Sequence, residues 1–296
     1  KWQVINPANE ETVCEVPYGG AEDCSLAIAA AEKSFHTWSR ETPYVRAAIL
    51  KKAADIIRQD AEHFAAVMSS ESGKPPAESK GEWGVAADLF EWFAEEGKRS
   101  YGRTIPARRA DKRMTVILQP LGVVGVITAW NFPAYNPARA CAAALAAGCT
   151  VVFLPSEYTP LSGMLLAGAL ERAGIPAGVF NLISGDPGPM GQTMLSEAAC
   201  RKISFTGSPR VGKILLDGAS KTLTRLGLEL GGNAPVLVLP VPALDPQPGA
   251  VDREDPVPAR GAFEAEAGAE HVLLENTEVH LPRERELPLR DRKSVV

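Results

Sequence analysis

Between residues 122 and 230 the sequence alternates short apolar runs with amphipathic segments, and the connections between them are only a few residues long. The runs GVVGVIT (122–128) and TVVFL (150–154) are continuously apolar, which is typical of strands buried on both faces. Alternating strands and helices build a parallel sheet covered by helices, so the predicted fold class is α/β. The other predicted strands are 179–183, 202–205, 226–230 and 235–239, and the predicted helices are 137–148, 160–173, 189–198 and 208–220.

The first hundred residues have a different pattern, which predicts an N-terminal segment of helices and edge strands. Two short alternating pieces within residues 1–20 predict the edge strands. Apolar residues at helical spacing predict a helix over 22–38, a long amphipathic helix from Pro43 to about Ser70, and a third helix over 84–100.

The composition excludes several classes of partner. The net charge is −5, and residues 1–240 carry 24 basic and 24 acidic side chains, so nothing indicates a nucleic-acid partner. No run reaches the ~18 apolar residues that a membrane-spanning helix needs, so no membrane partner is expected. The five cysteines form no CxxC pair, which predicts free thiols, no metal site and a cytoplasmic location.

In parallel sheets ligands bind at the carboxyl ends of the strands, so the loops there hold the candidate site residues. Trp130 and Asn131 directly follow the strand at 122–128. The Asn131 amide can donate to a developing oxyanion, or it can simply close a turn. Glu157 follows the next strand, where it can accept from ribose hydroxyls or belong to a helix start with Thr159 as N-cap.

A third loop, SFTGSPRVGKIL (204–215), leads from a strand into a helix, whose first N–H groups and dipole favour a pyrophosphate. Gly207, Gly212 and Lys213 approach the spacing of a nucleotide P-loop. That motif needs Ser or Thr next as its magnesium ligand, and the chain has Ile214, so an ATPase or kinase is not indicated.

A fourth loop, LELGGNAP (228–235), places Glu229 at the end of an apolar strand and before two glycines. A carboxylate there can act as a water-activating base. It can equally pair with a nearby cation, such as Arg225.

The pieces WNFP, PSE-x-TP, FTGS-x-x-x-GK and LELGG occur together in the order and spacing of the aldehyde dehydrogenase superfamily, which residues 3–240 resemble. Within it, the chain is most similar to succinate-semialdehyde dehydrogenase-like members. The resemblance implies a Rossmann-like sheet, NAD or NADP as cofactor, and a small-molecule aldehyde substrate oxidised to a carboxylic acid. It also implies a homo-oligomer for the full-length protein.

The resemblance further implies roles for individual residues. Asn131 would hold the oxyanion formed when a cysteine thiolate attacks the aldehyde, and Glu229 would activate the hydrolytic water. The cofactor contacts would fall on Trp130, Glu157, Phe205, Thr206, Gly207, Ser208 and Gly212.

The sequence departs from the family pattern in three places. Leu154 stands where the family commonly has Lys, which puts a preference for NADP in doubt, and Pro209 stands where Thr is common. The family's nucleophile lies a few tens of residues beyond LELGG, but this sequence has no cysteine after Cys200. Cys141 and Cys149 are expected to be buried structural thiols. The chain as given is therefore expected to be inactive, and the alternative function is a dinucleotide-binding pseudoenzyme or interaction module.

The final segment lacks the alternating strands and helices with which the resemblance implies that the catalytic domain would continue. Residues 241–296 contain seven prolines, 19 charged residues and one aromatic residue, a composition that cannot bury much apolar surface. The predicted division is therefore a family domain over 1–240 and a non-family tail over 241–296. The tail is either a genuine disordered segment or non-native sequence that replaces the catalytic domain.

Overall fold

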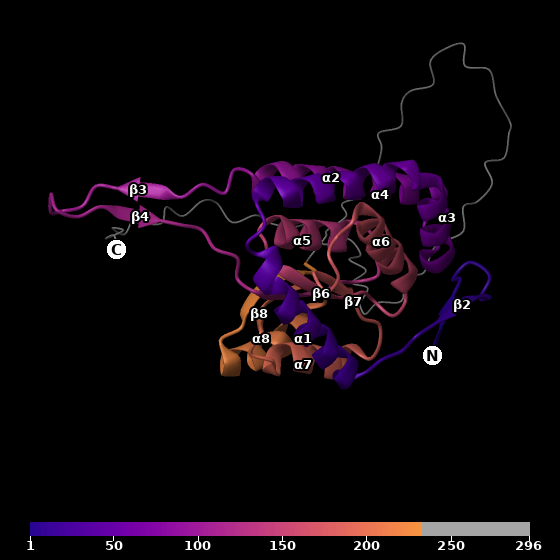
Figure 1. Ribbon diagram of the computed structural model, residues 1–296. Helices are drawn as coiled ribbons and strands as arrows, with labels where there is room; N and C mark the ends of the chain where they lie inside the picture. The colour runs from indigo at the N-terminus through magenta and orange to yellow at the C-terminus, as the bar shows by residue number, and fades with distance from the viewer. Residues whose placement is uncertain (233–296) are drawn as a thin grey trace, which may run out of the picture. The chain divides into compact units, whose positions relative to one another are not determined.

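The computed structural model describes residues 1–232, which are built around a five-stranded parallel sheet (Figure 1). The strand order is β7-β6-β5-β8-β9. The strands are β5 (Val123–Ile127), β6 (Thr150–Leu154), β7 (Phe180–Leu182), β8 (Cys200–Gly207) and β9 (Arg225–Leu230). The chain runs from β5 outward to β7 and then returns to the other side of β5. This reversal creates a switch point at the carboxyl ends of β5 and β8, where open parallel sheets bind ligands.

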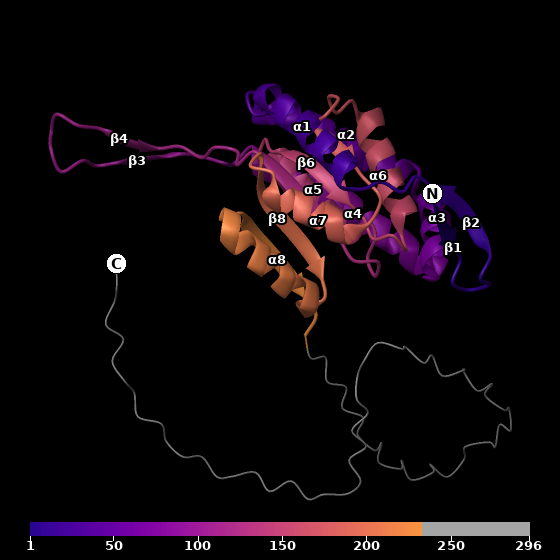
Figure 2. The same cartoon turned by 90° about the horizontal axis from the view of Figure 1, so that it is seen from below.

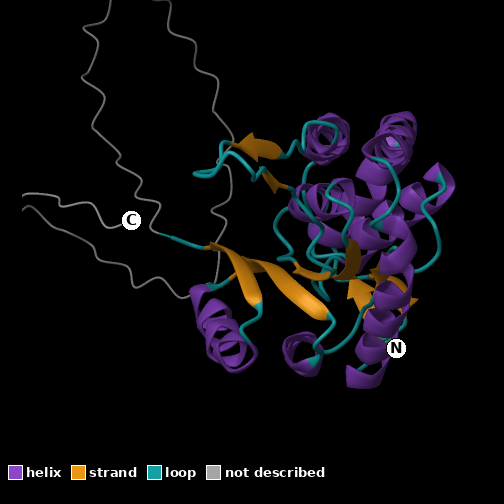
Figure 3. Ribbon diagram, turned by 60° about the vertical axis from the view of Figure 1, so that its left-hand side comes forward, coloured by secondary structure: helices purple, strands orange, loops and turns teal. Residues whose placement is uncertain are grey.

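Helices cover both faces of this sheet (Figure 3). On one face lie α5 (Tyr135–Ala146) and α6 (Pro160–Ala173), with α2 (Pro43–Gln59), α3 (Ala61–Ser72) and α4 (Pro76–Gly97) packed outside them. On the other face lie α1 (Ala21–Trp38), α7 (Pro187–Ser196) and α8 (Pro209–Thr222). Figure 2 views the sheet from this second face and shows α8 beside β8, with α1 and α7 also on the face toward the viewer.

The continuously apolar strands supply both cores, as the sequence predicts. In β6, Val151 and Phe153 enter the core shared with α5 and α6. Val152 and Leu154 enter the core shared with α1 and α7. Successive strand residues point to opposite faces, so a strand buried on both sides needs apolar residues throughout. The α/β prediction is confirmed.

Three predictions about the N-terminal segment need correction. The helix predicted over 84–100 is α4, which begins eight residues earlier because Pro76 opens it at the first helical position. The helix predicted from Pro43 to Ser70 is two helices, because the chain turns at Asp60 (φ −97°, ψ 11°) between α2 and α3. The predicted edge strands are β1 (Trp2–Ile5) and β2 (Thr12–Val16). They pair with each other as an antiparallel hairpin and add nothing to the edge of the main sheet.

A second hairpin was not predicted from the sequence. β3 (Arg103–Ile105) and β4 (Met114–Val116) pair in an arm, residues 102–119, that extends away from the helices (Figure 1). Every residue of both strands is exposed, so no burial pattern marked them as strands. The predicted strand at 235–239, the boundary at residue 240 and the tail lie outside the described residues. Within residues 1–232, no helix is both long and apolar enough to cross a membrane.

Candidate functional site

A cavity of about 540 Å³ opens at the carboxyl ends of β5, β6 and β8, beside α7 and α8. It lies at the switch point of the sheet. Six of the residues singled out from the sequence line it together: Trp130, Glu157, Phe205, Thr206, Gly207 and Ser208. Three loops that are far apart in the sequence therefore meet around one space.

The N-terminus of α8 forms one wall of this cavity. Ser208 is the N-cap, and its hydroxyl accepts from the Val211 N–H at 3.3 Å. Pro209 follows at the first helical position, where its missing N–H costs nothing. Arg210 also lines the cavity and adds a cation to the positive end of the helix dipole. Sequence reasoning missed Arg210, although a basic residue in a candidate phosphate turn was an available signal.

The two glycines of this turn have different surroundings. A Cβ on Gly207 would collide with the Phe205 ring, so the chain can turn over that ring only with glycine there. Gly212 is not among the residues that line the cavity. A Cβ on it would lie 2.8 Å from a Leu230 methyl group, so its place in the structure is the close contact between α8 and the end of β9.

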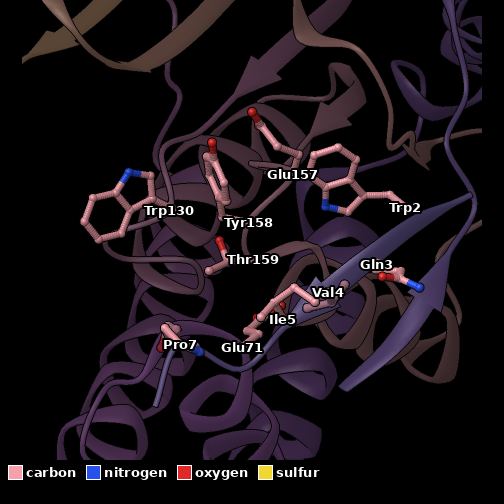
Figure 4. Close-up of a pocket in the computed structure, with 11 residues that line it drawn as sticks. Trp2, Gln3, Val4, Ile5, Pro7, Glu71, Trp130, Glu157, Tyr158 and Thr159 are labelled. Carbon is pink, nitrogen blue, oxygen red and sulfur yellow. The ribbon is translucent and has the colours of Figure 1, made fainter. Parts of the chain in front are cut away.

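Trp130 and Glu157 also line a second cavity of about 540 Å³, between their loops and the β1–β2 hairpin. Figure 4 shows the Trp130 and Trp2 rings on opposite sides of it, with Tyr158 between them. Thr159 is the N-cap residue of α6 and Pro160 is at N1, as predicted, but the Thr159 side chain makes no capping hydrogen bond.

Asn131 is exposed in the loop that follows β5. Hydrogen bonds hold both its backbone carbonyl and its side-chain amide. Its backbone carbonyl accepts from Lys74 Nζ at 3.0 Å, and its Oδ1 accepts from Asn136 Nδ2 at 3.4 Å. With Oδ1 engaged in this way, Nδ2 is the side-chain atom that can donate to a ligand. Lys74 and the buried Asn136 were not singled out from the sequence.

Glu229 lies on the face of the sheet that α5 covers, whereas the cavity described above lies beside α7 and α8 on the other face. Its side chain is 62% exposed, and its Oε1 is 3.3 Å from Nη1 of Arg139 on α5. The partner suggested from the sequence, Arg225, is wrong: four residues along a strand span about 13 Å. Glu229 lines a groove of about 560 Å³ with Arg139, Lys202 and Ser204. Asn131 is not among the residues that line this groove.

The aldehyde dehydrogenase family model matches residues 1–246. The chain belongs to the aldehyde dehydrogenase family. It is 46% identical over 242 residues to succinate-semialdehyde dehydrogenase [NADP(+)] of Escherichia coli, covering 82% of this chain and 50% of that protein. It is 44% identical over 243 residues to glutarate-semialdehyde dehydrogenase of Pseudomonas putida, covering 82% and 51%. This aldehyde dehydrogenase-family chain thus spans about half the length of the relatives it matches.

Solved structures agree with this assignment. The crystal structure of succinate-semialdehyde dehydrogenase from Burkholderia pseudomallei matches with a TM-score of 0.78 and 44% identity, covering 81% of this chain and 50% of that one. Betaine aldehyde dehydrogenase from Staphylococcus aureus, in complex with NAD+, matches with a TM-score of 0.76 and 34% identity, covering 78% and 46%.

Three of the buried thiols of this family member are poor nucleophiles. All five cysteines are free, and Cys24, Cys141, Cys149 and Cys200 are buried, so the prediction that Cys141 and Cys149 are buried is confirmed. Burial raises the pKa of Cys24 to about 12 and that of Cys200 to about 11, and it also raises the pKa of Cys141. A thiol must lose its proton to attack an aldehyde, so these groups are held in their unreactive form. Within residues 1–232, no group of three or more potential metal ligands is present.

Proposed function

We propose that this chain is the cofactor-binding part of an NAD(P)-dependent aldehyde dehydrogenase, whose complete form oxidises an aldehyde to a carboxylic acid. The observation that carries the proposal is the meeting of three motif loops around one cavity at the switch point, with the N-terminus of α8 as one wall. The proposed division of the chain is a cofactor-binding domain over 1–240 and a separate tail over 241–296.

The cavity suits a dinucleotide. The positive end of the α8 dipole, the Arg210 N–H and the Arg210 guanidinium suit its pyrophosphate, and Gly207 lets the backbone approach closely. Glu157 would accept from ribose hydroxyls, and Trp130, Phe205, Thr206 and Ser208 would complete the walls. Gly212 would not contact the cofactor, but its close contact with Leu230 would set the position of α8. When bound, NAD or NADP supplies the hydride acceptor for the reaction.

The substrate-side roles in this proposal fall on two residues. Asn131 would donate from Nδ2 to the oxyanion, with its amide oriented by Asn136. Glu229 would activate water after leaving Arg139. Because this ion pair is exposed, it is worth only about 0–1 kcal/mol and would not prevent that movement.

The proposed substrate is an aldehyde that carries an anionic group, such as succinate semialdehyde. The support comes from relatives of the chain, which are a succinate-semialdehyde dehydrogenase, a glutarate-semialdehyde dehydrogenase and a 3-sulfolactaldehyde dehydrogenase. NAD and NADP both remain candidates, since relatives are described with either one.

We propose further that residues 1–296 bind the dinucleotide without oxidising an aldehyde, because all five thiols lie between Cys14 and Cys200 and four of them are buried. The free thiols favour a reducing compartment, and we propose the cytoplasm. We also propose that the full-length protein is a homo-oligomer, with the exposed Ile117 and Leu118 of the arm at 102–119 as part of its subunit contact.

Calorimetric titration of the purified chain with NAD+ and NADP+ tests this function. Saturable binding is expected, and Arg210→Ala should weaken it about tenfold, the cost of one charge-assisted contact. Arg108→Ala, in the exposed arm, is the matched control and should bind like the unmodified chain. Absence of binding would contradict the cofactor proposal. Steady reduction of NAD(P)+ by succinate semialdehyde would contradict the proposal of inactivity.

A further inference from the structure

The end of α3, the short connection at 73–75 and the first two turns of α4 together form a segment, residues 71–82, that lies against the loops that follow β5 and β6. It carries two acidic side chains that are almost completely buried: Glu71 is 3% exposed and Glu82 is 7% exposed. Buried carboxylates are rare unless their oxygen atoms are satisfied by donors. The donors to these two carboxylates come from elements about 50 to 90 residues later in the chain.

Glu71 receives its hydrogen bonds from the start of α6. The backbone N–H of Leu161 donates to Oε2 at 2.7 Å, and the N–H of Ser162 donates to Oε1 at 2.8 Å. The Ser162 hydroxyl also donates to Oε1. These contacts satisfy two of the N–H groups that a helix leaves unpaired at its N-terminus. Glu71 lies in the wall of the cavity shown in Figure 4, at the end opposite Glu157.

Glu82 performs the same task for α5. Its Oε1 accepts from the N–H groups of Ala134 and Tyr135 at 2.8 and 3.0 Å. Its Oε2 pairs with Lys74, whose Nζ also donates to the Asn131 carbonyl and lies 4.2 Å from the centre of the Phe132 ring. The loop that carries Trp130 and Asn131 is therefore tied to the helix pair by both Glu82 and Lys74.

The helices that receive these contacts lack caps of their own. The N-cap residues of α5 and α6 are Ala134 and Thr159, and neither makes a side-chain capping bond. The Thr159 hydroxyl is buried without a partner within the described residues. By contrast, α7 and α8 are capped locally by Asp186 and Ser208. In α5 and α6 a distant carboxylate thus takes the place of the missing local cap, and both helices follow a loop of the candidate site.

We propose that Glu71 and Glu82 are positioning residues, which cap α6 and α5 from a distance and thereby hold the Glu157 loop and the Trp130–Asn131 loop in their binding conformation. The effect on binding rests on the proposed cofactor function. The capping itself does not, since it concerns only contacts within the protein.

The isosteric change Glu71→Gln gives a sharp test. Both Glu71 oxygen atoms accept from N–H groups, so a Gln amide must place its NH₂ group against one of them. Glu62→Gln is the matched control, since Glu62 lies on the same helix and its side chain is 82% exposed, so its ion pair with Lys80 contributes little. In Glu82→Gln, the amide oxygen can keep the N–H groups of α5, and the NH₂ group faces Lys74. This variant separates loss of the ion pair from loss of the cap.

Hydrogen exchange followed by mass spectrometry on the full chain measures the caps directly. In Glu71→Gln we expect about tenfold faster exchange in residues 155–165, the scale of a lost cap, with unchanged exchange in β8 and α8. In Glu82→Gln we expect faster exchange in residues 129–133 while the first turn of α5 stays protected. Unchanged exchange in these segments would overturn the capping proposal. Glu71→Asp withdraws the carboxylate by one methylene without adding a donor, so it decides the question if the Gln variant does not fold.

Titration of the same proteins with NAD+ tests the effect on binding. We expect about tenfold weaker binding for Glu71→Gln and no change for Glu62→Gln. Faster exchange with unchanged affinity would overturn the positioning role. If the unmodified chain itself does not bind NAD+, the proposed function fails, and the exchange data still decide whether the caps exist.

Discussion

Glu71 combines two opposing effects in a single side chain. Its hydrogen bonds from Leu161 and Ser162 favour the ionised carboxylate. Burial opposes ionisation more strongly, and it raises the pKa of Glu71 to about 7. The protein therefore holds a carboxyl group that titrates near neutrality next to a loop of the candidate site.

This shift predicts how stability depends on pH. The pKa is raised on folding from 4.5 to about 7, so the folded state binds more protons than the unfolded state between these values. The contribution of Glu71 to the free energy of unfolding is thus largest below pH 4.5 and declines as the pH rises to about 7. Relative to Glu71→Gln, the unmodified chain should lose on the order of 3 kcal/mol across this range. Urea unfolding of both proteins at several pH values measures the difference, and a difference independent of pH would contradict the prediction.

Gly207 allows a second prediction at a single position. In Gly207→Ala the new methyl group collides with the Phe205 ring, which is only 5% exposed and cannot swing freely into solvent. Overpacking of this kind costs about 1–3 kcal/mol, so the midpoint of urea unfolding should fall. Gly81→Ala on α4 is the control, because no atom outside its chain neighbours and the backbone of its own helix lies within 4 Å of the added methyl group. Equal midpoints for the two variants would show that the Phe205 ring yields without cost.

Side chains from distant parts of the chain hold both ends of α5. Glu82 caps its N-terminus, while its last carbonyl groups accept from Trp38 Nε1 at 3.2 Å and from Arg46 Nε at 3.0 Å. All three side chains come from the first hundred residues. The small residues of α5 fit this arrangement, because Gly97 of α4 packs directly against Ala146.

The arm at 102–119 behaves in the opposite way, since it makes contact mainly with itself. Ile117 and Leu118 are each 66% exposed, which is an unusual cost for apolar side chains at neighbouring positions. Replacing both with Ser should leave the melting temperature nearly unchanged and should reduce self-association in sedimentation velocity. Arg108→Ser, also exposed in the arm, should change neither quantity. A large drop in melting temperature would show that the two residues pack within their own subunit.

For the molecule as a whole, the sequence predicted the architecture better than the contacts. The continuous run at 150–154 and the periodic segment at 160–173 coincide with β6 and α6, because burial on both faces and helical spacing leave few alternatives. The break at Asp60 was missed because Ile57 and Phe64, on either side of it, enter the same core and keep the apolar pattern continuous.

The candidate site shows the same limit. The rule that ligands bind at strand ends predicted six residues that line one cavity in the structure. The roles of these residues in binding are proposals. Lys74, Glu71 and Glu82 were missed because their partners lie 52 to 91 residues away. In the sequence they look like ordinary charged residues near helix ends.

The segment at 71–82 also limits where the chain can be cut to produce a stable fragment. A fragment beginning near residue 120 would include the whole five-stranded sheet, and on topology alone it would look like an autonomous nucleotide-binding unit. It would lack both distant caps, and its ligand loops would be untethered. A chimera that borrows this sheet should therefore also carry α3 and α4. During synthesis, the loops after β5 and β6 can dock as soon as they emerge, since the side chains that receive them have already been made.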